Sequence, residues 1–258
     1  MLRDAAPERR LLQAAALSRA VRDMALAGLR SRHPGASPAE IRRRLGALVL
    51  GPSARHVGEV QFDAEEGPPV DDDLVAVVVE VAQALERTGA AYAIGGSFAS
   101  SLHGLPRATN DVDLVADVRP VHVEALVAEL GGDFYIEPDV VRAAVAAGTS
   151  FNIIHHRTLF KVDVFVKGTD AFRSVQVARA KAQAVRGASL RVLSPEDVIL
   201  AKLLWYRDGA GVSDRQWRDA LDVFAVQGER LDMAYLRAAA RDMGLEDLLN
   251  RVLSEAGL

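Results

Sequence analysis

Three carboxylates have the residue type and spacing that could support chemistry. Asp111 and Asp113 lie two residues apart in the apolar segment DVDLVADV, and Asp163 lies in a second apolar segment, LFKVDVFV. Alternate residues of a strand face the same side, so Asp111 and Asp113 should project together. Carboxylate oxygens suit Mg²⁺, which completes its coordination with water and phosphate oxygens. If the two strands are neighbours, the pattern predicts a divalent-metal site for phosphoryl transfer.

A glycine turn lies ahead of these acids. Gly95 and Gly96 follow a short apolar run, and glycines there let backbone amides approach a phosphate closely. Ser97 is predicted to open a short helix whose amino terminus favours an anion, and its hydroxyl can reach a β- or γ-phosphate. The turn is therefore a candidate triphosphate-binding element.

Two polar residues stand directly before the first acid. Arg107 and Thr109 are candidates for contacting the triphosphate or for ordering the loop. Each feature is weak alone, because glycine pairs are common and charged strand residues often protect a sheet edge. Their combination favours a nucleotide site. The alternative in which the acids only flank strands stays open.

The segments GGS and RATNDVDLV, followed by a distal strand aspartate, resemble the nucleotidyltransferase superfamily typified by DNA polymerase beta. The resemblance implies that the glycine turn holds the triphosphate of an NTP and that the carboxylates hold two Mg²⁺ ions. It implies that Asp111 and Asp113 bind both metals, and that Asp163 binds the catalytic metal and activates the attacking hydroxyl. One ion lowers the pKa of the attacking oxygen, and the other stabilises the leaving pyrophosphate.

The later segment SPEDVILAKLLW and the helices after it resemble AbiEii-type toxins and related nucleotidyltransferase-like proteins of bacterial toxin–antitoxin and defence systems. In those proteins a helical lysine and a later acid line the nucleotide pocket. The resemblance implies a phosphate contact for Lys202, with a surface lysine as the alternative. Either Asp219 or Asp222 would be the later acid. The resemblance spans roughly residues 71–244.

The elements that must position these residues predict an α+β fold with a mixed sheet. We expect a helical hairpin over 1–52, a linker over 53–70, a nucleotidyltransferase core over 71–193 and a helical bundle over 194–258. Helices are predicted at 8–31, 38–50, 74–88, 121–130, 139–147 and 194–206, with two or three more over 214–226 and 233–257. Strands are predicted at 91–94, 134–136, 150–155 and 159–166, with one edge strand inside 184–192. Residues 171–180 are amphipathic or loop-like.

The composition limits the possible functions. The 258 residues include no cysteine, which excludes disulfides, thiolate metal sites and thiol catalysis. Charged residues interrupt every apolar run before the roughly 20 residues that a membrane span needs. The first residues lack the apolar segment of a signal peptide. We therefore expect a cytoplasmic protein with no membrane partner.

Arginine is concentrated at the amino terminus. Residues 1–50 hold ten arginines against four acids, a local charge of +6, which leaves −10 on the rest because the whole chain carries −4. A basic arm on an acidic body can contact a tRNA or another RNA. The alternative is that these arginines form the solvated faces of amphipathic helices.

A few other residues are weaker candidates. His103 could lie near the nucleotide or in a polar loop, and the adjacent His155 and His156 should face opposite sides of a strand, which argues against joint ligation. Trp205, Tyr206 and Trp217 could stack a base or belong to the core.

Two functions follow from these expectations. The first is a Mg²⁺-dependent enzyme that moves an NMP from an NTP to a hydroxyl of RNA, protein or a small molecule, and the resemblance to toxin–antitoxin proteins adds a cognate antitoxin as a candidate partner. The second is a non-catalytic nucleotide-binding or protein-interaction module with the same fold.

Overall fold

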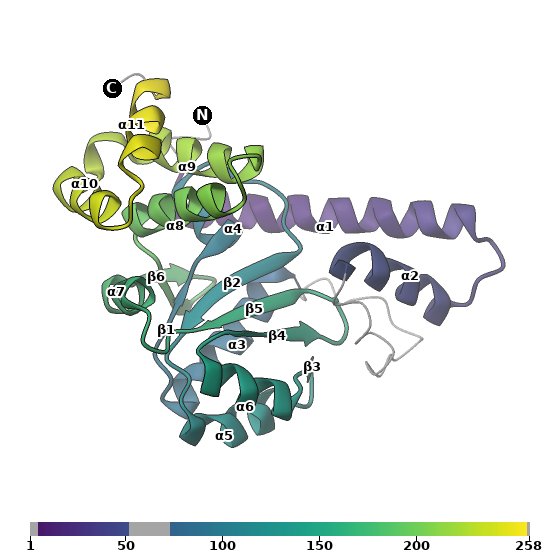
Figure 1. Ribbon diagram of the computed structural model, residues 1–258. Helices are drawn as coiled ribbons and strands as arrows, with labels where there is room; N and C mark the ends of the chain where they lie inside the picture. The colour runs from purple at the N-terminus through teal and green to yellow at the C-terminus, as the bar shows by residue number, and fades with distance from the viewer. Residues whose placement is uncertain (1–4, 52–72, 257–258) are drawn as a thin grey trace.

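A mixed β-sheet of seven strands lies at the centre of this computed structural model, which describes residues 5–51 and 73–256 (Figure 1). The strand order is β3-β4-β5-β2-β1-β7-β6. The strands are β1 (Tyr92–Ile94), β2 (Asp111–Ala116), β3 (Phe134–Tyr135), β4 (Ser150–His155), β5 (Lys161–Val166), β6 (Lys181–Val185) and β7 (Ala188–Val192). β1 pairs antiparallel with β2 and parallel with β7, so both pairings occur. The expected α+β fold is confirmed.

Helices cover both faces of the sheet. Figure 1 shows α8 and α9 on one side and α3, α5 and α6 on the other. The helices after the amino-terminal hairpin are α3 (Leu74–Thr88), α4 (Gly96–His103), α5 (Pro120–Leu130), α6 (Pro138–Ala147), α7 (Ala171–Arg179), α8 (Pro195–Asp208), α9 (Asp214–Gln227), the 3-10 helix η2 (Gly228–Arg230), α10 (Met233–Asp242) and α11 (Glu246–Glu255).

The side-chain alternation of β5 determines how the sheet divides core from site. Val162, Val164 and Val166 are buried, whereas Lys161 and Asp163 on the other face are part-exposed. β2 alternates in the same way at its start, where Asp111 and Asp113 flank buried Val112. The apolar faces pack into the main core, and the polar face is left for chemistry.

Caps set the start of two helices that frame the sheet. The Asp73 carboxylate accepts hydrogen bonds from the backbone N–H groups of Val75 and Ala76 at the start of α3. The Ser194 hydroxyl accepts the N–H of Asp197 at the start of α8. Asp73 is thus the N-cap of α3, and Ser194 is the N-cap of α8.

The prediction of one edge strand inside 184–192 was wrong. The structure has a hairpin there, in which β7 pairs with β1 and β6 forms the edge of the sheet. The signal of β6 was missed because its residues are mostly exposed and lack an apolar alternation. The turn between the strands is made by Arg186 and Gly187, both with positive φ. Residues 171–179, expected as amphipathic or loop-like, form α7.

The amino-terminal residues form a helical hairpin, as expected. Its helices are α1 (Pro7–Arg32) and α2 (Pro38–Leu50), and α1 extends beyond the sheet (Figure 1). Leu29, Ile41 and Leu45 form a small apolar cluster with Leu159 of the core. The expected linker over 53–70 lies outside the described residues, and the division into domains stays a prediction.

The arginines of the hairpin do not all behave alike. Arg9, Arg30, Arg32, Arg43 and Arg44 are exposed, as the amphipathic alternative predicts. Arg10 and Arg22 are instead buried against the core. In the part of the chain that the structure describes, no helix combines the length and apolarity needed to cross a membrane.

Candidate active site

The three candidate carboxylates lie on one face of two adjacent strands. β2 and β5 are parallel neighbours, with Asp113 opposite Asp163 and Asp111 opposite Lys161. Neighbouring strands are about 4.8 Å apart, and residues two apart in a strand share a face. The structure therefore brings Asp111, Asp113 and Asp163 together, as their spacing predicted.

The grouped negative charge changes how these acids titrate. Burial, together with the charges of Asp111 and Asp163, raises the pKa of Asp113 to about 6 against the opposing effect of Lys202 and Lys161. Burial also raises the pKa of Asp163 despite its contact with Lys161. Neighbouring carboxylates repel one another when all of them are ionised. A divalent cation bound by their oxygens would offset this repulsion.

The carboxylates nevertheless do not form a closed metal cage. Among the described residues, no three His, Cys, Asp or Glu side chains are arranged so that they could hold one ion as they stand. The Lys161 ammonium lies 2.7 Å from Asp163 Oδ2 and occupies that oxygen. Lys161 was not among our sequence candidates, although its place two residues before Asp163 puts both on one face of β5.

The glycine turn lies directly against Asp113. Gly96 has a φ of +55°, and a Cβ there would lie 1.9 Å from Asp113 Oδ2. The Gly95 N–H donates to the Asp113 carbonyl oxygen at 2.8 Å. Helix α4 begins at Gly96, one residue earlier than expected. The turn therefore needs glycine at position 96 for both conformation and space.

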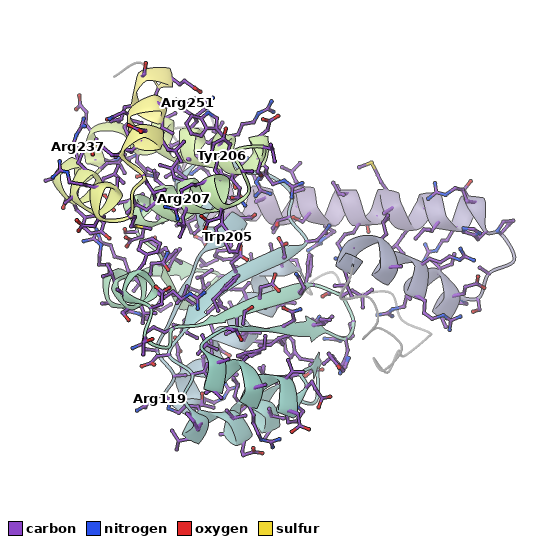
Figure 2. The ribbon with its side chains drawn as sticks, viewed as in Figure 1. Arg119, Trp205, Tyr206, Arg207, Arg237 and Arg251 are labelled. Atoms are coloured by element: carbon purple, nitrogen blue, oxygen red, sulfur yellow. The ribbon has the colours of Figure 1, made fainter. Side chains whose placement is uncertain are left out.

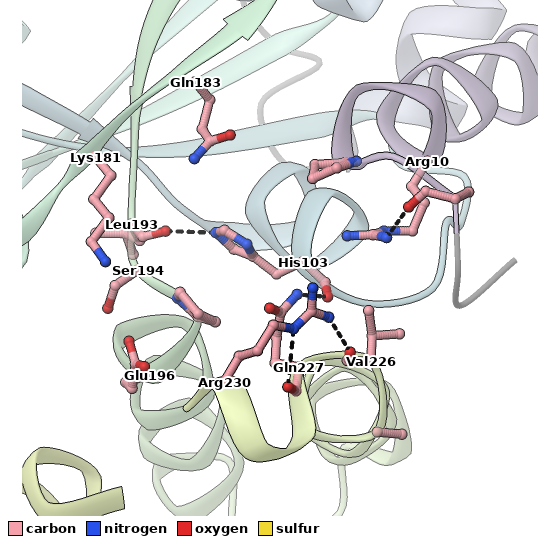
Figure 3. Close-up of a pocket in the computed structure, with 14 residues that line it drawn as sticks. Arg10, His103, Lys181, Gln183, Leu193, Ser194, Glu196, Val226, Gln227 and Arg230 are labelled. Carbon is pink, nitrogen blue, oxygen red and sulfur yellow. Dashed lines mark hydrogen bonds between the residues drawn. The ribbon is translucent and has the colours of Figure 1, made fainter. Parts of the chain in front are cut away.

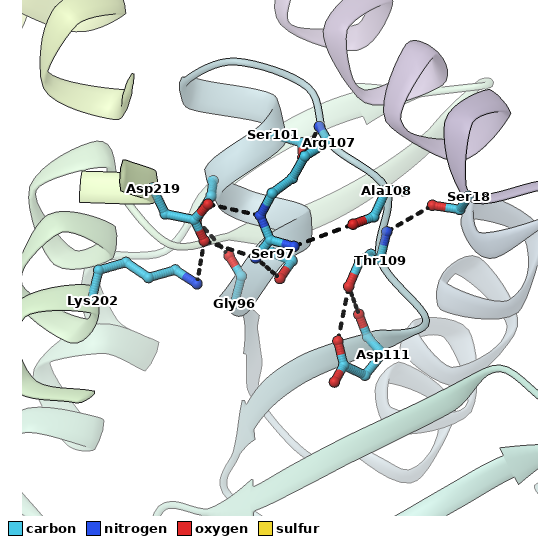
Figure 4. A network of polar contacts seen from close by, with 11 residues as sticks. Ser18, Gly96, Ser97, Ser101, Arg107, Ala108, Thr109, Asp111, Lys202 and Asp219 are labelled. Atoms are coloured by element: carbon cyan, nitrogen blue, oxygen red, sulfur yellow. Dashed lines mark hydrogen bonds and ion pairs between the residues drawn. The ribbon is translucent and has the colours of Figure 1, made fainter. Parts of the chain in front are cut away.

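Thr109 orients the first acid. Its hydroxyl donates to Asp111 Oδ1 at 2.8 Å, and its own N–H donates to the Ser18 hydroxyl of α1 at 2.9 Å (Figure 4). Of the two roles considered for Thr109, the structure shows the ordering role. The chain of contacts also links the amino-terminal hairpin to the site, which the sequence did not indicate.

Arg107 joins the glycine turn to α9. It donates to both carboxylate oxygens of Asp219, at 2.7 and 2.8 Å, and to the Ser97 hydroxyl at 2.5 Å (Figure 4). Lys202 lies on the other side of Asp219, with 2.8 Å between its ammonium and Oδ2. Arg107 thus also has an ordering role in this structure.

The same network decides between two alternatives left open by the sequence. Asp219, rather than Asp222, pairs with Lys202. Lys202 is 4% exposed, so the surface alternative was wrong. Burial would raise the pKa of Asp219, but Arg107 and Lys202 outweigh it and hold the pKa below its usual value. Asp219 is therefore an ionised acid between two cations.

The aromatic candidates separate into two groups. Tyr206 and Trp217 pack together at 5.0 Å between ring centroids, and Trp217 is buried. Trp205 is 53% exposed and lies edge-on to Phe165, 5.9 Å away, on the strand that carries Asp163 (Figure 2).

The histidine candidates lie away from the carboxylates. His103 belongs to the last turn of α4 and is buried, so it does not lie in the polar loop that we considered. His155 bonds to the Thr158 hydroxyl at 2.8 Å.

Comparison with known proteins gives two kinds of match. A sequence model of the Rv0078B-related antitoxin family matches residues 3–61. A search of curated proteins returned no match. Among solved structures, an antigenic nucleotidyltransferase-like protein from Paracoccidioides brasiliensis is 21% identical, with a TM-score of 0.48 over 71% of this chain and 93% of that one.

The antibiotic-resistance factor ANT(2'')-Ia is also similar. Its solution structure is 20% identical, with a TM-score of 0.44 over 69% of this chain and 97% of that one. Its complex with adenylyl-2''-tobramycin is 17% identical, with a TM-score of 0.44 over 66% and 97%. One of the matched structures is thus described as nucleotidyltransferase-like, and the matched family model is described as antitoxin-related.

Proposed function

We propose that this chain transfers a nucleoside monophosphate from an NTP to a hydroxyl acceptor and releases pyrophosphate, using Mg²⁺. The observation that carries the proposal is the β2–β5 register, which gathers three carboxylates beside a glycine turn that touches Asp113. Phosphoryl transfer requires mainly positioning and charge stabilisation, and this arrangement offers both.

Each group has a role in this proposal. Asp111 and Asp113 would hold two Mg²⁺ ions together with phosphate oxygens, and Asp163 would complete the site of the catalytic ion. Bound Mg²⁺ would supply Lewis-acid stabilisation of the charge that develops on the attacking and leaving oxygens. Asp163 would accept the proton of the acceptor hydroxyl, since its carboxylate stands at the end of the row and is part-exposed.

The network around Asp219 would bind the triphosphate. Ser97 stands at the amino terminus of α4, where backbone N–H groups favour an anion. Arg107 contacts both Ser97 and Asp219, and Lys202 lowers the pKa of Asp113 by its charge. In this proposal Asp219 holds the two cations in place before the nucleotide arrives.

Trp205 is our candidate for stacking the base. Its exposed indole lies beside Phe165, on the strand and face that carry Asp163. Stacking on an aromatic face contributes about 1–3 kcal/mol per base. We expect Trp205→Ala to weaken NTP affinity about tenfold or more, whereas Trp217→Phe should leave it unchanged because Trp217 is buried elsewhere.

The test is titration calorimetry of each NTP with and without Mg²⁺. We expect metal-dependent binding by the wild type and none by Asp111→Asn/Asp113→Asn with its fold intact by circular dichroism. Asp117→Asn is the matched control, because Asp117 directly follows the same strand. Its carboxylate lies 3.4 Å from the Lys167 ammonium. Binding that survives the double substitution would refute the carboxylate site.

The acceptor is tested separately with a labelled NTP. Transfer of label to RNA, protein or a small molecule would identify the acceptor class. Tight Mg²⁺-dependent NTP binding without transfer to any acceptor would favour the non-catalytic module.

We propose RNA as the acceptor class, tRNA included. The exposed arginines of the hairpin, Arg30, Arg32 and Arg43, could contact a phosphate backbone. Their joint replacement by glutamine should weaken RNA binding and flatten its salt dependence without affecting NTP binding. Unchanged RNA affinity would contradict the RNA proposal and leave the transferase proposal intact.

The antitoxin-related match supports a second role for the amino-terminal segment. We propose that α1 restrains the transferase site of its own chain, because it contacts α4 at Leu102 and the site loop at Thr109. Loosening α1 with Ser18→Ala and Arg22→Ala should then raise NTP turnover. A fall in turnover would mean that α1 only supports the loop.

A further inference from the structure

A cavity lies at the opposite end of α4 from the glycine turn. Its volume is about 770 Å³, within the usual range for small-molecule sites. It is lined by the start of α1, the last residue of α4, strand β6, the start of α8 and the end of α9 (Figure 3). None of the candidate active-site residues lines it, and seven residue steps of helix, about 10 Å, separate its His103 from the turn at Gly96.

The charge of this cavity is mainly positive. Arg10, Lys181 and Arg230 line it, against the single carboxylate of Glu196. Glu196 accepts the N–H of Asp232 at 2.9 Å and faces Arg179 at 3.7 Å. Its carboxylate is therefore already paired with groups other than the three cavity cations. No carboxylate of the described residues lies within ion-pair distance of the three cavity cations.

Backbone carbonyls, instead of acids, hold the two arginines. Arg10 is 3% exposed and donates to the Leu102 carbonyl oxygen at 2.6 and 3.1 Å and to the Ala5 carbonyl oxygen at 2.5 Å, which engages three of its five N–H groups. Arg230 donates to the Val226 carbonyl oxygen at 2.5 Å and to that of Gln227 at 3.3 Å. A guanidinium has five N–H donors, so both arginines keep donors for a ligand. Carbonyls fix their direction and do not neutralise their charge.

The cations also repel one another. Burial lowers the pKa of Arg10, and the nearby charge of Arg230 lowers it further. Burial, helped by the charges of Arg10 and Lys181, likewise lowers the pKa of His103 to about 4, so its imidazole is neutral at pH 7 and can contact a ligand without adding charge. Gathered cations without acidic partners cost stability, which an anion would recover.

We propose that this cavity is a second ligand site that binds a phosphate-bearing small molecule. Arg10, fixed at the inner wall, and Arg230, at the end of α9, would bind phosphate oxygens, with Lys181 as a third, more mobile donor at the opening. The start of α8 adds the favourable field of a helix amino terminus. The site needs neither Mg²⁺ nor the carboxylates of β2 and β5.

The test separates the two sites by removing the first. Calorimetry with pyrophosphate and with AMP, in EDTA, is done on full-length Asp111→Asn/Asp113→Asn protein. We expect at least one of these probes to bind, and the one that binds more tightly identifies the ligand as a free diphosphate or a nucleoside phosphate. The carbon-bound ring proton of His103, assigned from His103→Gln, should shift in the NMR spectrum at the same ligand concentrations.

Two charge variants locate the binding. Lys181→Gln/Arg230→Gln should raise the dissociation constant about tenfold or more. Arg237→Gln, which removes an exposed arginine of α10 outside the cavity, should leave it unchanged. Lys181→Gln alone is the second variant to measure if the double variant misfolds. Lys181 is exposed, whereas Arg230 also holds the end of α9.

Three outcomes would overturn the proposal. They are no binding of either probe at millimolar concentration, equal weakening by Arg237→Gln, and binding that leaves the His103 signal in place. None of these outcomes depends on transferase activity, so this proposal can fail while the proposed function stands.

Discussion

Arg107 and Asp219, 112 residues apart in the sequence, form a two-bond ion pair that fastens the loop before β2 to helix α9. Asp219 is 5% exposed and also carries the Lys202 ammonium at 2.8 Å. One carboxylate therefore balances two cations in a largely buried position. Removing it leaves a buried charge without a partner, which is the costly way to break such a contact.

Asp219→Ala should lower the free energy of unfolding by about 3–5 kcal/mol. The reason is that Lys202 would remain buried with no carboxylate in contact. Urea unfolding followed by circular dichroism measures the change. Asp222→Ala, three residues along the same helix and part-exposed, should cost less than about 1 kcal/mol. Equal losses would contradict the role of Asp219.

Gly96→Ala should abolish Mg²⁺-dependent NTP binding and lower stability. Its Cβ would meet Asp113 Oδ2 at 1.9 Å, and its φ of +55° disfavours any side chain. Gly95→Ala is the matched control, because its Cβ would meet the end of the Leu193 side chain at 3.0 Å and would stand at an ordinary contact distance, 3.8 Å, from the Asp113 carbonyl oxygen. We expect it to keep most of the affinity. If the two variants bind NTP equally well, the turn does not shape the site.

Lys161→Met should tighten the binding of Mg²⁺ in the absence of nucleotide. Lys161 occupies Asp163 Oδ2 at 2.7 Å and repels any second cation at that carboxylate. Calorimetric Mg²⁺ titrations of the two proteins measure the difference, with Lys167→Met as the control at the other end of the strand. Weaker Mg²⁺ binding by Lys161→Met would show that Lys161 supports the metal site instead of competing for it.

Stability should fall in mildly acidic solution because of His103. Burial lowers its folded-state pKa to about 4, while the unfolded value is near 6.5. As the pH falls below 6.5 the unfolded chain takes up the proton first, so stability is lost between about pH 6.5 and pH 4. The loss from this group is at most about 3 kcal/mol.

His103→Gln should lose less stability over that range and keep the hydrogen bond that the ring makes to the Leu193 carbonyl oxygen at 2.8 Å. Urea unfolding at several pH values compares the two proteins. Parallel pH profiles would mean that another group controls the acid sensitivity.

The sequence predicted the parts of the site that depend on local pattern. A two-residue period placed Asp111 and Asp113 on one face, and cap residues marked the starts of α3 and α8. Those signals are local because strand alternation and helix capping involve neighbours in the chain. The pairing of β2 with β5 was only a condition of the prediction, and the structure meets it.

What the sequence could not show depends on contacts between distant segments. Lys161 looked like one more strand residue until its partner was known, and Asp219 could not be separated from Asp222 without Arg107 beside it. The edge strand β6 has no apolar alternation because it packs on one side only through Val185. The contact of Ser18 with the site loop could not be predicted without knowing that α1 runs across α4.

The contact between Ser18 of α1 and Thr109 of the site loop joins two parts of a single polypeptide. A segment carried in the same chain is synthesised in a one-to-one ratio with the site that it touches. Its local concentration at the site does not depend on the expression level, because the encounter is intramolecular. Dilution, or selective loss of a separate partner protein, therefore cannot remove α1 from this site; only a change in the chain's own conformation or its cleavage can do so.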